Sequence, residues 1–174
     1  MTETNWAGNI AYAAGSISMP RTVSEVQAAV KAAKKLRPLG SRHSFNRISD
    51  TGGTLLSLRG LERRFDLDRA ASTVTVDGGM TYGELGPRLA AAGYALHNLA
   101  SLPHISIVGA VATATHGSGN ANRNLAGAVA GLELVTATGD IVQLSRSDAE
   151  FDGAVVNLGA LGVVTSITLD LEPH

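Results

Sequence analysis

Hydrophobic side chains recur at helical spacing in the first third of the chain. Val23, Val26 and Val30 lie three and four residues apart, which is the spacing of one buried face of an α-helix. Ser24, followed three residues later by Gln27, resembles a capping box, the pattern that marks the beginning of a helix. The pattern therefore predicts a helix over this stretch.

An extended run precedes this helix and a short apolar run follows it. Residues 10–12 have extended character, and residues 36–39 have the pattern of a short strand. In strand–helix–strand units, ligands usually lie at the carboxyl end of a strand. We therefore expect the loop that begins at Gly40 to bind a ligand.

Glycines divide the middle of the chain into short candidate strands. The runs at residues 54–58, 64–67 and 73–76 are bounded by glycine, and in the last of them valine alternates with threonine. This alternation has the period of a strand with one buried face. Near the end of the chain, residues 163–171 alternate in the same way and predict a final strand.

Two further helices and a hairpin complete the pattern. The pattern predicts a helix over residues 82–92 that Gly93 closes, and a shorter helix over residues 147–156. Residues 138–140 predict a hairpin turn between two apolar runs. Together these elements predict an α+β fold, in which a small strand–helix–strand unit is followed by a larger, mostly antiparallel sheet with helices.

The composition narrows the function classes. A chain of 174 residues suits one domain or two small subdomains. Its net charge of -1 argues against nucleic acid as a partner, and no apolar run is long enough to span a membrane, so we expect a cytoplasmic protein. Charged residues make up 17% of the chain, where about 25% is typical. We therefore expect a ligand or a protein segment to cover part of its surface.

Several chemical motifs are absent or incomplete. The chain has no cysteine, which excludes disulfides and a thiol nucleophile. Residues 117–119 lack the third glycine of a dinucleotide-binding fingerprint. His97, His104 and His116 share no helical face and have no adjacent carboxylate, which argues against a metal site. The single tryptophan, Trp6, is expected to be a core anchor.

Two polar stretches that contain glycine carry the candidate chemistry. Residues 39–46 place glycine, two serines and a cation around His43, so that backbone N–H groups can surround a phosphate beside an imidazole. Residues 101–119 combine small side chains with hydroxyl groups, which lets the backbone approach a flat or charged ligand. The structural alternative is an ordinary Gly-Ser turn and a tightly packed segment near a sheet edge.

These stretches resemble a known cofactor domain. Residues 40–45, 102–119 and 158–165 resemble, in the same order, motifs of the FAD-binding domain of the vanillyl-alcohol-oxidase superfamily. Within that superfamily, residues 5–9 and 98–104 are most similar to the alditol (xylitol) oxidases. The resemblance covers essentially the whole chain.

The resemblance implies two FAD-binding subdomains and a role for each matching residue. We expect the subdomains to span residues 1–58 and 59–174. His43 matches the histidine that bonds covalently to the 8α-methyl group of the flavin, and Ala100 matches the position that governs oxygen access. Arg42 stands where some family members have glycine. The loop that holds the pyrophosphate corresponds to Gly40, Ser41, Arg42, Ser44 and Phe45. The second wall of the FAD cleft and the further cofactor contacts correspond to Ser101, Ser106, Gly109, Thr113, Thr115, His116, Gly117, Gly159 and Val163.

The implied reaction is the FAD-dependent oxidation of a polyol CH–OH group, with O2 as acceptor and H2O2 as product. In the family, the groups that bind the polyol lie in a second, substrate-binding (cap) domain, which we expect to be absent from this sequence. We therefore expect these residues to bind FAD covalently through His43 but to lack catalytic residues and metal ligands, as a monomer or a weakly self-associating protein. Two alternatives are a minimal flavin-binding module, stand-alone or engineered, and a structural domain that packs against a missing partner.

Overall fold

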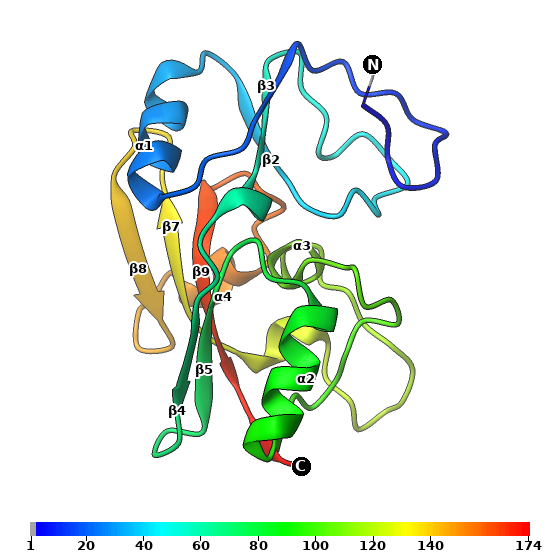
Figure 1. Ribbon diagram of the computed structural model, residues 1–174, viewed down its shortest axis with the longest axis vertical. Coiled ribbons are helices and arrows are strands. Elements are labelled where there is room, and N and C mark those ends of the chain that lie inside the picture. Colours follow the sequence, from blue (N-terminus) through cyan, green and yellow to red (C-terminus); the bar gives the residue numbers. More distant parts are fainter. Residues whose placement is uncertain (1–2) are drawn as a thin grey trace.

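The computed structural model describes residues 3–174, which form a small sheet and a larger sheet, one above the other (Figure 1). The small sheet consists of β1 (Ser16–Ser18), β2 (Leu36–Leu39) and β3 (Thr54–Ser57), in the order β1-β3-β2 with both pairings parallel. The helix α1 (Val23–Ala32) connects β1 to β2. The predicted strand–helix–strand unit is confirmed, although its first strand lies at β1 and not at residues 10–12.

The helix α1 begins slightly earlier than the sequence pattern indicates. Thr22 is its N-cap and accepts a hydrogen bond from the backbone N–H of Glu25 at 3.2 Å, so the predicted cap at Ser24 is wrong. The Glu25 carboxylate in turn accepts from the backbone N–H of Arg21 at 2.7 Å, and the two bonds together fix the first turn. The valine face of the helix is buried, as predicted.

The larger sheet has five strands, each antiparallel to its neighbours. Its strands are β4 (Phe65–Asp68), β5 (Thr73–Asp77), β7 (Val129–Val135), β8 (Ile141–Ser145) and β9 (Val163–Asp170), in the order β4-β5-β9-β7-β8. The last strand of the sheet in sequence, β9, lies at its centre, and most of its residues are buried. The predicted α+β class, with a mostly antiparallel larger sheet, is confirmed.

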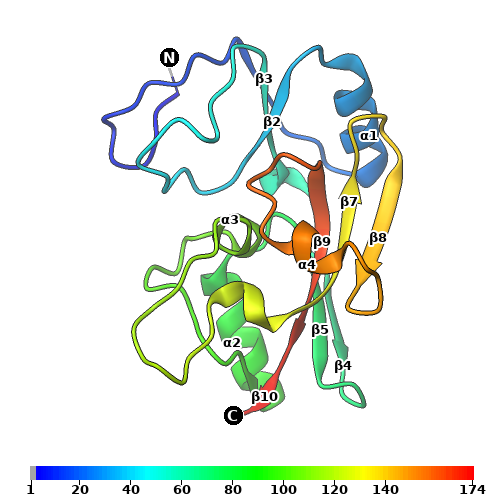
Figure 2. The same cartoon turned by 180° about the vertical axis from the view of Figure 1, so that it is seen from behind.

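Three helices pack on one face of this sheet (Figures 1 and 2). The helix α2 (Tyr82–Ala92) has the predicted bounds and ends at Gly93, whose φ is 82°. The helix α4 (Phe151–Val155) is shorter than the one predicted over residues 147–156. The sequence pattern does not predict α3 (Ile107–Ala112), because small residues and a glycine leave it without a clear apolar stripe.

Short elements complete the chain. A 3-10 turn spans Leu58–Gly60 and another spans Leu125–Ala128. Two short strands, β6 (Tyr94–Ala95) and β10 (Glu172–Pro173), form an antiparallel pair. Among residues 3–174, none of the helices has the length and apolar character needed to cross a membrane.

Two hydrophobic clusters hold these layers together. The main cluster lies between the larger sheet and the helices α2, α3 and α4. The second cluster joins α1 and the small sheet to the ends of β7 and β9, and it includes Val26, Leu56, Val135 and Val163. Because the second cluster contains residues of both sheets, it fixes the small sheet against one end of the larger sheet.

Gly78 offers a test of this packing. A Cβ added at Gly78 lies 2.1 Å from the carbonyl oxygen of Val164 and 2.7 Å from the Cδ1 atom of Leu58. We expect Gly78→Ala to lower the free energy of unfolding by about 1–3 kcal/mol, as overpacking does in dense cores. Gly153→Ala is the matched control, because Gly153 is exposed within α4 and an added Cβ there meets no atom of the surrounding structure within 4 Å. The control should be more stable by about 0.5–1 kcal/mol.

Denaturant unfolding of both variants measures the two effects. A Gly78→Ala protein as stable as the wild type would contradict the close contact with Val164.

Candidate functional site

A cavity of about 510 Å³ lies between the small sheet and the helix α3. Its walls come from the loop after β2, the segment that leads into α3, the turn after β5 and the loop before β9. Thirteen of the residues that the sequence resemblance implicates line it: Gly40, Ser41, Arg42, His43, Ser44, Phe45, Ala100, Ser101, Ser106, Gly109, Thr113, Thr115 and Gly159. The other three, His116, Gly117 and Val163, are not among its lining residues.

The three residues outside the cavity have different surroundings. His116 is exposed, and its ring Nδ1 lies 3.2 Å from the carbonyl oxygen of the adjacent Gly117. Val163 is buried in the second hydrophobic cluster, behind the cavity wall. The sequence motifs therefore identify the segments that form the cavity more accurately than they identify each side chain.

The loop after β2 leaves a run of backbone donors without protein partners. From residue 41 to residue 45, no backbone N–H donates a hydrogen bond to any group in residues 3–174. Arg42 adopts φ 65°, in the left-handed region that favours glycine. This backbone conformation explains why some members of the family that the chain resembles have glycine at this position. Successive N–H groups around a left-handed residue form a concave site for anions.

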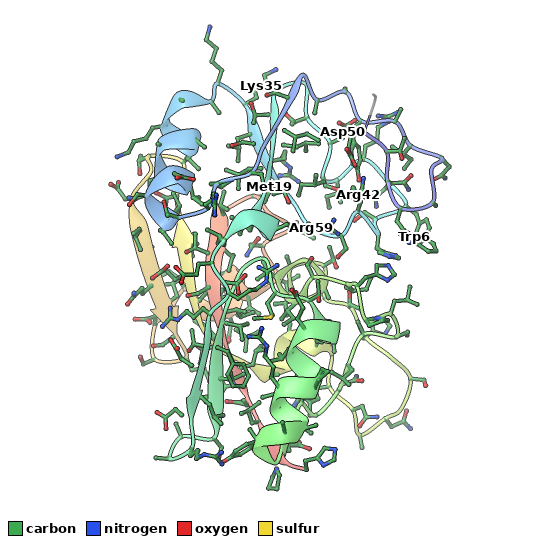
Figure 3. The ribbon with its side chains drawn as sticks, viewed as in Figure 1. Trp6, Met19, Lys35, Arg42, Asp50 and Arg59 are labelled. Carbon is green, nitrogen blue, oxygen red and sulfur yellow. The ribbon has the colours of Figure 1, made fainter. Side chains whose placement is uncertain are left out.

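The N-terminal segment holds this loop from outside the cavity (Figure 3). The Arg42 guanidinium forms an ion pair with Glu3, and the Arg42 carbonyl accepts from the backbone N–H of Trp6 at 2.9 Å. Farther along the loop, the Asp50 carboxylate accepts from the backbone N–H of Ala13 at 2.8 Å. Because the charge of Arg42 is paired with a carboxylate, the anion-binding capacity of the loop depends mainly on its backbone.

The two walls of the cavity meet at a buried pair of serines. The Ser41 hydroxyl oxygen accepts from the backbone N–H of Ser106 at 2.5 Å, and it donates to the Ser106 hydroxyl at 3.2 Å. A Cβ added at Gly40 would lie 2.7 Å from the Ser106 Oγ atom, and one added at Gly109 would lie 2.6 Å from it. Glycine at both positions therefore permits the close approach of the two walls.

Three aromatic rings stack at the edge of the cavity. Trp6 stacks on His43 with ring centroids 4.5 Å apart and planes inclined by 24°. The Nε2 atom of His43 lies 2.5 Å from the Nε2 atom of His104, and both histidines line the cavity. Trp6 is 55% exposed, so the expectation of a core anchor is wrong. Its indole instead covers the imidazole of His43, on the outer side of the cavity.

The environment of His43 favours its neutral form. Burial lowers the pKa of His43 below its usual value of 6.5, and repulsion between the two rings when His104 is also protonated lowers it further. A neutral imidazole keeps a nitrogen lone pair for bonding. Within the described part of the chain, no cluster of three or more His, Cys, Asp or Glu side chains is arranged to hold a metal ion.

One wall that the sequence analysis did not single out is the turn Gly78–Gly79, which is anchored by Asp77. Asp77 is buried, and its carboxylate accepts from the Arg63 guanidinium at 2.9 Å and from the backbone N–H of Gly79 at 3.0 Å. The sequence signal that could have identified this turn is the glycine pair directly after the aspartate that ends a strand.

A further wall is the loop before β9, which the sequence resemblance includes through Gly159. Arg37, from β2, donates to the carbonyl oxygen of Leu158 at 3.1 Å and also to that of Ile48. Leu158 and Gly159 both have positive φ, 54° and 69°, so this loop has a tight turn that Arg37 holds against the loop after β2. Nothing in the sequence around Arg37 indicates this role, because its partners are backbone groups distant in sequence.

Comparison with known proteins identifies the family. Residues 15–145 match the FAD binding domain family, which is more than half of the chain. The chain belongs to this family of FAD-binding domains. The resemblance to the FAD-binding domain of the vanillyl-alcohol-oxidase superfamily is thereby confirmed.

Several relatives of this FAD-binding domain are enzymes of greater length. Over 173 residues, the chain is 50% identical to an alditol oxidase of Streptomyces sp., covering 98% of this chain and 42% of that protein. It is 39% identical over 174 residues to an L-gulono-1,4-lactone dehydrogenase of Mycobacterium tuberculosis, covering 98% of this chain and 40% of that protein. It is 31% identical to an L-gulonolactone oxidase of Mus musculus, again covering 98% and 40%. The chain spans about two fifths of the length of these relatives.

The cavity of this FAD-binding domain fits the cofactor of its family. FAD carries a flat ring system and a pyrophosphate with two negative charges, and the cavity volume lies within the usual range for small-molecule sites. The unpartnered N–H groups of residues 41–45 suit the pyrophosphate. Arg59, labelled in Figure 3, also lines the cavity. Its guanidinium has no hydrogen bond or ion pair with any group in residues 3–174. Its positive charge is therefore available to a phosphate.

Removal of the Ser41 hydroxyl tests the contact between the walls. We expect Ser41→Ala to lower the free energy of unfolding by about 1–3 kcal/mol, because the buried N–H of Ser106 loses its acceptor. Ser44→Ala is the control, since the Ser44 hydroxyl has no hydrogen bond within residues 3–174, and it should change stability by less than about 0.5 kcal/mol. Urea unfolding of the flavin-free proteins gives both values. Equal losses in the two variants would contradict a special role for Ser41.

The lowered pKa of His43 predicts a specific titration. An unfolded histidine takes up its proton near pH 6.5, whereas folded His43 resists protonation until lower pH. The unfolded state therefore binds more protons in the window just below pH 6.5, and the stability that His43 contributes falls as the pH falls through that window. NMR titration of the imidazole signals, assigned with His43→Ala, should give a midpoint below 6.5. A midpoint at or above 6.5 would contradict the partial burial of this ring.

Proposed function

We propose that this chain is the FAD-binding part of a flavoenzyme that oxidises a terminal CH–OH group of a polyol, and that FAD is attached covalently to His43. In the overall reaction, the polyol loses two electrons and two protons to become an aldehyde, and O2 takes them up to become H2O2. The single observation that carries the proposal is the position of His43, a neutral imidazole on the wall of a cavity lined by unpartnered N–H groups. The 50% identity to an alditol oxidase supports a polyol as the substrate.

In this proposal, two subdomains, residues 1–58 and 59–174, hold FAD between them. The loop Gly40–Phe45 binds the pyrophosphate through its backbone. The opposite wall would contact FAD through Ser101, Ser106, Gly109, Thr113 and Thr115, while Gly159 bounds the cavity near β9. His116, Gly117 and Val163 lie outside this lining, so any contact they make with FAD requires local rearrangement.

The protein groups of this domain bind and orient the cofactor. FAD, when bound, supplies the chemistry of accepting a hydride. A covalent bond from His43 would fix the ring system and make it a stronger oxidant. Ala100, which lines the cavity, has a side chain small enough to leave room for O2 beside the ring.

The groups that bind and deprotonate the polyol belong, in this proposal, to a substrate-binding domain in the additional length that the relatives have. Large apolar side chains beside the cavity support a covering segment: Phe45 is 68% exposed, Leu99 54% and Leu102 39%. Without that segment, we expect the 174 residues to bind FAD and O2 but to oxidise polyols negligibly, with some tendency to self-associate.

The covalent bond is tested by mass. We expect the purified protein, after denaturation, to carry the added mass of one FAD and to fluoresce yellow on a gel. His43→Ala should lose both signals completely while still binding FAD reversibly, because the walls that hold the pyrophosphate remain. His97→Ala is the control, since His97 does not line the cavity, and it should keep the covalent flavin.

Two results would count against the proposal. Covalent flavin in His43→Ala would exclude His43 as the attachment site. Wild-type protein that binds FAD only reversibly would favour a flavin-binding module without covalent chemistry.

A further inference from the structure

The contact between His43 and His104 assigns a role to a residue that the preceding proposal leaves unused. We propose that His104 is the base that takes the ring proton of His43 while FAD becomes attached to His43. This inference rests on the proposed covalent function and names the group that would promote it.

The geometry pairs the two imidazoles through one nitrogen each. The two Nε2 atoms are 2.5 Å apart, so a proton lies between them and only one ring can hold it at a time. With His43 as donor, its Nε2–H points at His104, and its Nδ1 carries the lone pair. The Nδ1 atom of His43 has no hydrogen bond to any group in residues 3–174, so this lone pair is available to form a bond.

The surroundings of His43 leave His104 as its base. The pKa of His43 responds to burial and to repulsion from His104 whenever both rings are protonated, and no carboxylate contributes. The nearest cation in sequence, Arg42, is paired with Glu3. Trp6 stacks on the His43 ring at 4.5 Å and on the His104 ring at 6.1 Å, so the indole restrains both rings in the paired arrangement. The position of Trp6 is itself fixed by its backbone N–H, which donates to the Arg42 carbonyl at 2.9 Å.

The attachment step balances in bonds, protons and electrons. A bond forms between Nδ1 of His43 and the 8α carbon of FAD, and one C–H bond of that methyl group and the Nε2–H bond of His43 break. Two protons and two electrons leave, and O2, the acceptor in the proposed function, takes them up as H2O2. Without a base, bond formation at Nδ1 would leave a positive charge on the His43 ring. His104 removes that charge by accepting the Nε2 proton, and because His104 is exposed it can then pass the proton to water.

The experiment follows attachment in protein produced without flavin, from riboflavin-starved cells. FAD is added, samples are denatured at intervals, and in-gel fluorescence and intact mass give the fraction of protein with covalent FAD. We expect His104→Gln and His104→Ala to slow attachment by about 100-fold or more, the usual size of a general-base effect. Reversible FAD affinity, measured before attachment proceeds, should change by less than about threefold. His97→Gln, the matched histidine control, should attach FAD at the wild-type rate.

Added imidazole separates a proton-transfer role from a structural role. We expect it to restore attachment in His104→Ala in proportion to its concentration, and to have no effect on His43→Ala. In the flavin-free protein, His104→Gln should move the NMR midpoint of His43 back toward 6.5, because the neighbouring charge is lost.

Each other outcome overturns the proposal in a recognisable way. Attachment at the wild-type rate in both His104 variants would exclude His104 as the base. Loss of reversible FAD binding in both would make it a binding residue, and slow attachment that imidazole does not restore would make its role structural. If wild-type protein attaches no FAD while it still binds FAD reversibly, the covalent function fails, and this is distinct from a failure of His104.

Discussion

The close contact between the loop after β2 and the start of α3 is the constraint on which the cavity depends. Two glycines face the same serine hydroxyl at distances that leave no space for a side chain, and a buried N–H has its acceptor across the contact. A hydrogen bond of this kind contributes little when formed but is costly to lose, because the buried donor has no water to replace its partner. The contact therefore fixes the separation of the two walls, and the other features of the cavity are built around it.

The loop after β2 illustrates how irregular backbone becomes available to a ligand. It connects two parallel strands that lie side by side in the small sheet, a connection that a helix usually makes. Here residues 40–53 contain no helix or strand, and the N-terminal segment satisfies many of their outward-facing groups, through contacts such as those of Arg42 and Asp50. Because those contacts order the loop without using the N–H groups of residues 41–45, the donors remain free without the loop becoming disordered.

Sequence patterns predicted the helices and strands that are specified by residues close together in the sequence. The bounds of α2 follow from its apolar spacing and its glycine stop, and β5 follows from its alternation of valine and threonine. The helix α3 escaped prediction because its glycine and alanines are there for close approach, which no periodicity records. The cap of α1 was misassigned because serine and threonine are chemically equivalent caps, and only the position of Glu25 distinguishes them.

In the candidate site too, features within short stretches of sequence were predictable, and contacts between distant segments were not. The motifs around His43 and Ser106 were visible in the sequence, because they concentrate glycine, serine and histidine in short stretches. The roles of Arg37 and Asp77 were not visible, since each acts on backbone groups that only the tertiary fold brings near. The exposed position of Trp6 was also not predictable, because the usual burial of tryptophan gives no indication that this one would cover a histidine.

The stacked position of Trp6 has an optical consequence. It is the only tryptophan in the chain, so all of its indole emission comes from one fixed point beside the cavity. Flavins absorb in the region where indoles emit, and at such short range an excited indole transfers its energy to a flavin almost completely. The chain therefore has a natural donor whose brightness reports, without any label, what fraction of the molecules hold a flavin.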